Sequence, residues 1–168
     1  ADIFLVFVKE IDSEDQCLIF SFFIDVLILR QASSTFIDMI QQKVLKSGFQ
    51  DEIECIEKVL ERHPFFSEII GTTSNIGFVK LGKALEDIHF DLAFSARSNL
   101  DPLQVIQKYK LKGSGGELSR SVAELFIAFC VDHSTKQSWH FKVCLDESEC
   151  LSNNQQKSLN TVVRLSKD

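Results

Sequence analysis

The sequence predicts an α+β fold, in which an antiparallel sheet carries helices on one side within a single compact domain. Two observations support this class. Segments rich in β-branched and aromatic residues come first and return later, whereas amphipathic helical spacing is clearest in two stretches between them. Because strands and helices are segregated, an antiparallel sheet backed by helices is favoured. The length of 168 residues suits about one domain.

The first expected elements are strands. Residues 2–8 form a short apolar run that indicates a buried strand, and a polar turn at 12–15 follows. Residues 18–29 are apolar almost throughout, so periodicity does not distinguish a long strand from a buried helix. We favour a strand because isoleucine, phenylalanine and valine dominate and a tight turn precedes the run.

Two helices are expected next. Residues 33–35 supply N-caps, apolar residues recur at helical spacing between 36 and 45, and Gly48 occupies a C-cap position. A second helix begins near residue 51, with one apolar stripe and an opposite acidic side, and Pro64 ends it.

The middle of the chain predicts another strand and a short helix. Residues 88–94 alternate between apolar and polar side chains, as a half-buried strand does, which places Phe90 and Phe94 with the apolar set. Asp101 followed by Pro102 is an N-cap with proline at the first helical position, so a helix is expected over 103–110.

The last part of the chain predicts a hairpin and a helix. Residues 122–131 and 138–145 are expected to be two strands joined by the polar loop 132–137. A final helix is expected within 155–165. Because an isolated two-stranded hairpin is only marginally stable, we expect this one to complete the sheet begun earlier in the chain.

A glycine-rich stretch separates the two parts of the chain. Three of the seven glycines lie within residues 113–116, and this composition is typical of a flexible engineered linker. We predict that an engineered Gly/Ser linker replaces a loop there, between a first segment, 1–112, and a second segment, 117–168, that completes the sheet. A fused second polypeptide, a natural glycine loop and an anion-binding nest of backbone amides are the alternatives.

Charge and apolar pattern exclude some partners. The net charge is −6, with −5 in residues 1–112 and −1 in residues 117–168. Nucleic-acid binding by direct charge is not expected, because it needs clustered basic residues. The longest apolar run, 17–29, is shorter than the roughly 18 residues that span a bilayer, so no membrane contact is expected.

Five cysteines without a tight framework indicate reduced thiols in an intracellular protein of the cytoplasm or nucleus. The chain begins without Met or a leader pattern, so we expect an excised fragment.

Catalytic and metal-binding patterns are weak. His140 and Cys144 would lie about 13 Å apart along a strand, too far apart for one zinc ion. Cys55 and His63 would lie about 12 Å apart along a helix, beyond hydrogen-bond reach. Asp25 and Asp91 interrupt apolar segments, and we expect both to face water. No catalytic residue, metal site or cofactor is predicted.

The predicted function is therefore a non-catalytic protein–protein interaction or scaffold domain of a larger intracellular protein or complex. The candidate partner-binding residues end the acidic helix or lie along it: Phe65, Phe66, Glu54, Glu57 and Glu61. The partner would be another protein with a basic or apolar segment, and a homo-oligomer is left open. The alternatives are a cysteine- or metal-dependent hydrolase with a site built from both segments, and a small acidic chaperone or adaptor that binds an unfolded segment.

Overall fold

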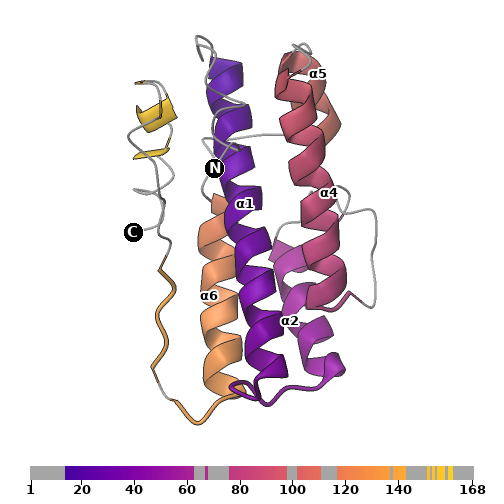
Figure 1. Ribbon diagram of the computed structural model, residues 1–168, viewed down its shortest axis with the longest axis vertical. Helices are drawn as coiled ribbons and strands as arrows, with labels where there is room; N and C mark the ends of the chain where they lie inside the picture. The colour runs from indigo at the N-terminus through magenta and orange to yellow at the C-terminus, as the bar shows by residue number, and fades with distance from the viewer. Residues whose placement is uncertain are drawn as a thin grey trace. The chain divides into compact units, whose positions relative to one another are not determined.

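The structure is helical. The computed structural model describes residues 14–62, 67, 76–97, 102–110, 117–136, 138–142, 151, 153, 155–157 and 159–160. In chain order the helices are α1 (Glu14–Gln41), α2 (Phe49–Arg62), α4 (Phe78–Arg97), α5 (Pro102–Tyr109) and α6 (Glu117–Asp132) (Figure 1). No strand occurs among these residues. The predicted α+β class with an antiparallel sheet is therefore wrong.

Three expected strands lie in helices. Residues 18–29 belong to α1, residues 88–94 to α4 and residues 122–131 to α6. Residues 138–142, expected to begin the second strand of the hairpin, are neither helical nor in a strand. The expected strand at 2–8 lies outside the described residues.

The helices with strong local signals were predicted correctly. The helix expected from residue 51 is α2, and the one expected after Asp101 is α5, which begins at Pro102. The helix expected from residue 33 exists as the second part of the longer α1. Residues 155–157 and 159–160, within the expected final helix, are also helical.

The first part of α1 escaped prediction because it is largely apolar and buried on all sides. Almost every side chain between Ile19 and Leu29 is buried, and such a helix shows no amphipathic period. Thr35, expected to be a cap, donates its hydroxyl hydrogen to the carbonyl of Gln31 at 2.9 Å, which is a bond inside a continuing helix.

Helix α1 also meets a length and composition criterion for a membrane span between Cys17 and Gln41. Most of that stretch is buried inside the structure, and a buried core helix meets the same criterion. This is weak evidence for a membrane span, so the absence of membrane contact stays a prediction.

Helices α4 and α6 carry their buried side chains at helical spacing. In α6 these are Val122, Leu125, Phe126, Phe129 and Cys130. In α4 they include Phe78, Leu81, Leu85, Ile88 and Leu92. Because steps of three and four residues are the mark of a helix, the sequence contained the correct period, and the aromatic and β-branched content was given too much weight.

The chain forms two compact units. Unit 1 comprises Ala1–Leu27, Asp87–Glu117 and Cys144–Asp168, and unit 2 comprises Ile28–Glu86 and Leu118–Val143. Helices α1 and α4 therefore contribute one part to each unit.

The core of unit 2 is a cluster of phenylalanine rings. Phe36 of α1 meets Phe126 of α6 edge to face, with ring centroids 4.6 Å apart. Phe78 of α4 lies 5.6 Å from Phe126 and 5.3 Å from Phe129, nearly perpendicular to both. These edge-to-face contacts are the favoured geometry for aromatic pairs, and they join α1, α4 and α6.

The turn between α1 and α2 differs from its predicted form. Lys43 has a φ of 58°, and the backbone N–H of Val44 donates to the carbonyl of Met39 at 2.8 Å, so Lys43 takes the left-handed position that ends α1. Gly48 is not the C-cap. Its N–H donates to Asp51 Oδ2 at 2.6 Å, which makes it part of the N-terminal cap of α2.

Candidate functional site

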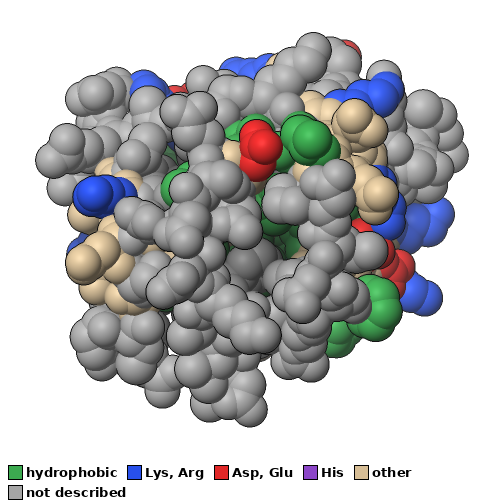
Figure 2. Space-filling view, turned by 90° about the horizontal axis from the view of Figure 1, so that it is seen from above, with side chains coloured by type: hydrophobic (Ala, Val, Ile, Leu, Met, Phe, Trp, Pro, Cys, Tyr) green, Lys and Arg blue, Asp and Glu red, His purple; other side chains and the backbone are tan. Residues whose placement is uncertain are grey.

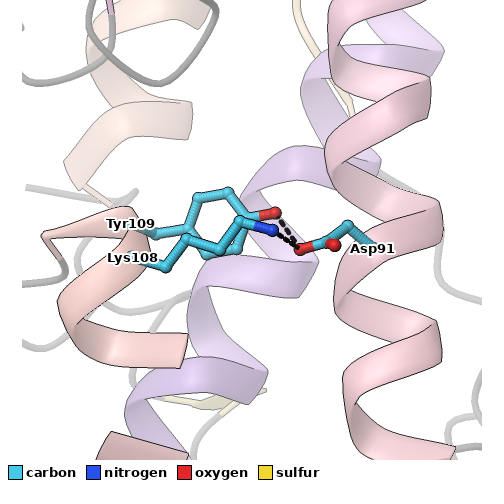
Figure 3. Close-up of polar contacts among 3 residues, drawn as sticks. All are labelled: Asp91, Lys108 and Tyr109. Atoms are coloured by element: carbon cyan, nitrogen blue, oxygen red, sulfur yellow. Dashed lines mark hydrogen bonds and ion pairs between the residues drawn. The ribbon is translucent and has the colours of Figure 1, made fainter. Parts of the chain in front are cut away.

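A polar cluster in unit 1 joins α4 to α5 (Figure 3). Asp91 Oδ2 accepts a hydrogen bond from Lys108 Nζ at 2.8 Å and another from the hydroxyl of Tyr109. The Tyr109 side chain is buried, and its ring lies 5.6 Å from that of Phe22 in α1. Asp91 was expected to face water from a strand; it lies on a helix instead, and its side chain is 35% exposed. Asp25, for which the same was expected, is buried in α1, so that expectation is wrong.

The cluster stabilises the charged form of Asp91 and the neutral form of Tyr109. Burial by itself would raise the pKa of Asp91, but the hydrogen bonds from Lys108 and Tyr109 and the charge of Lys108 outweigh it, so the pKa is lowered. Burial raises the pKa of Tyr109, and the hydrogen bond to the Asp91 carboxylate raises it further. Tyr109 therefore remains protonated at neutral pH and cannot act as a base. The cluster ties α5 to α4.

Two aromatic side chains project from α4 in unit 1. Phe90 is 60% exposed and Phe94 is 66% exposed. They lie four residues apart, on successive turns of one side of the helix, while Ile88 and Leu92 are buried. Figure 2 shows one face of the molecule, where a few hydrophobic side chains are visible at the surface beside charged ones. The two rings form what we call the Phe90/Phe94 pair.

The acidic residues predicted on α2 are exposed. Glu54, Glu57 and Glu61 are all accessible, and their spacing of three and four residues places them along one side of the helix. The opposite side of α2 is buried through Ile53, Cys55, Ile56 and Val59. Phe65 and Phe66 lie outside the described residues, so their role stays a prediction.

Two of the three described thiols are poor nucleophiles. Cys55 and Cys130 are free and buried. Burial is the main cause that raises the pKa of Cys55 to about 12 and that of Cys130 to about 11. A thiol reacts as its thiolate, so neither is activated at neutral pH. No group of three or more His, Cys, Asp or Glu side chains suited to a metal ion occurs within the described part of the chain.

A family comparison gives the context. The family model described as ORC-CDC6-like matches residues 5–168. The chain belongs to the ORC-CDC6-like family. No curated protein and no solved structure matches it. Membership of this family is consistent with the prediction that the chain is a domain that interacts with other proteins in a multiprotein complex. The family is associated with the initiation of DNA replication, which agrees with the intracellular location expected from the cysteines.

Sequence reasoning missed the two most exposed aromatic side chains among the residues that the structure describes. Alternation over 88–94 grouped Phe90 and Phe94 with Ile88 and Leu92 on one inward face. The signal that would have separated them is the helical series Leu85, Ile88 and Leu92, which continues the buried stripe of α4 and leaves both rings on the other side.

Proposed function

We propose that this ORC-CDC6-like chain is a non-catalytic helical domain that docks another protein of its complex through the Phe90/Phe94 pair. The observation that carries the proposal is the exposure of two phenylalanine rings, at 60% and 66%, on successive turns of one helix. Aromatic residues are common anchors in protein interfaces, where a few side chains supply most of the binding energy.

The exposed area is large enough to matter for affinity. Fully burying a phenylalanine is worth about 1.5–3 kcal/mol. Because about 60–66% of each ring remains to be covered, the pair would contribute about 2–4 kcal/mol in an interface. Each 1.4 kcal/mol is about tenfold in the dissociation constant, so loss of both rings would weaken binding by about 30-fold or more.

The polar groups of the described residues support a binding role over catalysis. Tyr109 is kept protonated, and Asp91 accepts hydrogen bonds from two donors at one carboxylate oxygen, which stabilise its charged form. Cys55 and Cys130 are buried with raised pKa values. Each of these arrangements lowers chemical reactivity, which is the opposite of the pKa tuning typical of catalytic sites.

The acidic side of α2 is a second proposed contact surface. Glu54, Glu57 and Glu61 are exposed along it, and we propose that they, with Phe65 and Phe66 beyond the helix, favour a partner segment that is basic or apolar. The proposed location is the nucleus or the cytoplasm.

The test compares two variants of the full-length protein. Phe90→Ser/Phe94→Ser removes the pair, and Val79→Ser removes an equally exposed apolar side chain, 66% exposed, from the part of α4 in unit 2. Partners recovered with the unchanged protein are identified by mass spectrometry, purified and titrated by calorimetry. We expect the double variant to bind a direct partner about 30-fold more weakly than the unchanged protein. Val79→Ser should bind it with unchanged affinity. Equal affinity for all three proteins would rule out docking through this pair.

A further inference from the structure

The negative charge of the chain belongs to one of its two units. Unit 1 contains 8 Lys and Arg residues and 14 Asp and Glu residues, a net charge of −6, whereas unit 2 contains 10 of each and is neutral. The net charge of the whole chain, −6, therefore resides in unit 1. A division of the sequence at the glycine-rich stretch hides this, because both units draw on residues before and after it.

The Phe90/Phe94 pair lies in the acidic unit. Asp87, which is exposed, precedes Phe90 by one turn of α4, and Asp91 lies next to it. The charge of Asp91 is offset by Lys108, whose ammonium donates a hydrogen bond to Asp91 Oδ2 at 2.8 Å, and α4 ends at Arg97, one turn beyond Phe94. The pair is therefore an apolar anchor point, with Asp87 beside it, in a unit of net negative charge.

We propose that the partner of the Phe90/Phe94 pair is a basic amphipathic helix of another protein, a proposal that rests on the function proposed above. Rings four residues apart on a helix are separated by about 6 Å along its axis, which matches apolar residues at steps of three or four on a facing helix. Lysine and arginine beside that apolar stripe complement the charge of unit 1.

The same charge disfavours the other occupants. A nucleic acid would bring phosphates toward a unit of net charge −6. A second copy of this chain would bring an equally acidic unit against the first, and such like-charge contacts oppose association. An acidic helix with a suitable apolar stripe would meet the rings but be repelled by Asp87 beside them and by the net charge of unit 1.

The two contributions respond differently to salt. At about 0.1 M salt the screening length is about 10 Å, so attraction between a basic helix and unit 1 weakens as salt rises. Burial of the phenylalanine rings does not depend on this screening. Affinity is therefore expected to fall with salt, while the factor lost on replacing both rings stays nearly constant.

The experiment uses the full chain and three synthetic peptides of about 18 residues, long enough for about five helical turns. All three carry the same leucine stripe, and lysine, glutamine or glutamate occupies the flanking positions. Binding is measured by fluorescence anisotropy between about 50 and 500 mM salt. Three proteins are compared: the unchanged chain, Phe90→Ser/Phe94→Ser and the Val79→Ser control. All three have the same net charge.

We expect the lysine peptide to bind at least about tenfold more tightly than the glutamate peptide, with the glutamine peptide between them. The double Phe variant should lose at least about tenfold in affinity, and Val79→Ser should match the unchanged chain. Lysine-peptide binding that is unaffected by the double variant would be non-specific charge attraction and would overturn the inference. If the glutamine or glutamate peptide binds more tightly and still needs both rings, the basic partner is wrong but the docking surface stands. If no peptide binding depends on the rings, the proposed function fails with it.

Discussion

Replacing Tyr109 with phenylalanine tests the cluster that ties α5 to α4. Tyr109→Phe keeps the ring that contacts Phe22 and removes only the hydroxyl that donates to Asp91 Oδ2. The volume of the side chain hardly changes, so no cavity of consequence is made. The measured change in the free energy of unfolding then reports the hydrogen bond itself.

The expected magnitude follows from the charge of the acceptor. A hydrogen bond to an ionised group contributes about 1.5–3 kcal/mol. Because Lys108 Nζ still donates to Asp91 at 2.8 Å, the carboxylate is not left without a donor, and we expect the lower end, about 1.5–2 kcal/mol. For a protein of this size 1 kcal/mol corresponds to about 2–4 °C, so the melting temperature should fall by about 3–8 °C.

The matched control is Lys108→Ala. The Lys108 side chain is 59% exposed, and exposed ion pairs contribute about 0–1 kcal/mol, so this variant should cost less than Tyr109→Phe. Urea unfolding followed by circular dichroism gives both values, and an unchanged m-value shows that the unfolding reaction is the same. A loss below about 0.5 kcal/mol for Tyr109→Phe, or a larger loss for Lys108→Ala, would refute the reasoning.

The contribution of the cluster should depend on pH. The pKa of Asp91 is lower in the folded chain than its unfolded value of about 3.9, so the unfolded chain binds that proton more readily. The stability from Asp91 is therefore present above about pH 4 and is lost as the pH falls through the folded pKa. The difference between the unchanged chain and Tyr109→Phe should be constant from about pH 5 to 8 and shrink in acid. A difference that grows in acid would contradict the assignment.

Three further predictions concern unit 2. Lys43→Gly should raise stability by about 0.5–1 kcal/mol in urea unfolding, because Lys43 has a φ of 58° and glycine adopts this region without strain; a Lys46→Gly variant should not. Phe126→Ala should lower stability by about 3–5 kcal/mol, because this fully buried ring contacts Phe36 and Phe78; a loss under 1 kcal/mol would be incompatible with the ring cluster. Cys55 and Cys130 should resist alkylation at pH 7.5 until urea unfolds the chain, since burial raises both pKa values; rapid labelling of the folded protein, seen by mass spectrometry, would contradict this.

The parts of the fold that the sequence predicts are those decided by neighbouring residues. Helix α2 has an apolar stripe with acidic residues on the other side, and α5 begins with proline after an aspartate. Both signals act within one or two turns of the chain. Helix α1 lacks them, because its first part is buried on every side. Composition then favoured a strand, although burial in a tertiary core overrides intrinsic strand preference.

The candidate site was less accessible to sequence reasoning. Alternating residues over 88–94 fitted a strand, and only the longer series across α4 shows that Phe90 and Phe94 leave the buried stripe. The pairing of Asp91 with Lys108 and Tyr109 depends on how α5 folds back along α4, which no local pattern encodes. The exposure of Glu54, Glu57 and Glu61 was predictable, because the amphipathic period of α2 is unambiguous.

The phenylalanine cluster of unit 2 has a consequence for synthesis on the ribosome. Phe36 and Phe78 emerge early, but their edge-to-face partner Phe126 belongs to α6, which leaves the exit tunnel only after the residues of α5 have been made. Until then the nascent chain carries unmatched aromatic surface, a state prone to aggregation and to chaperone capture. Polypeptides released before residue 117 should therefore be held by chaperones or degraded, whereas chains that extend through α6 should escape both fates.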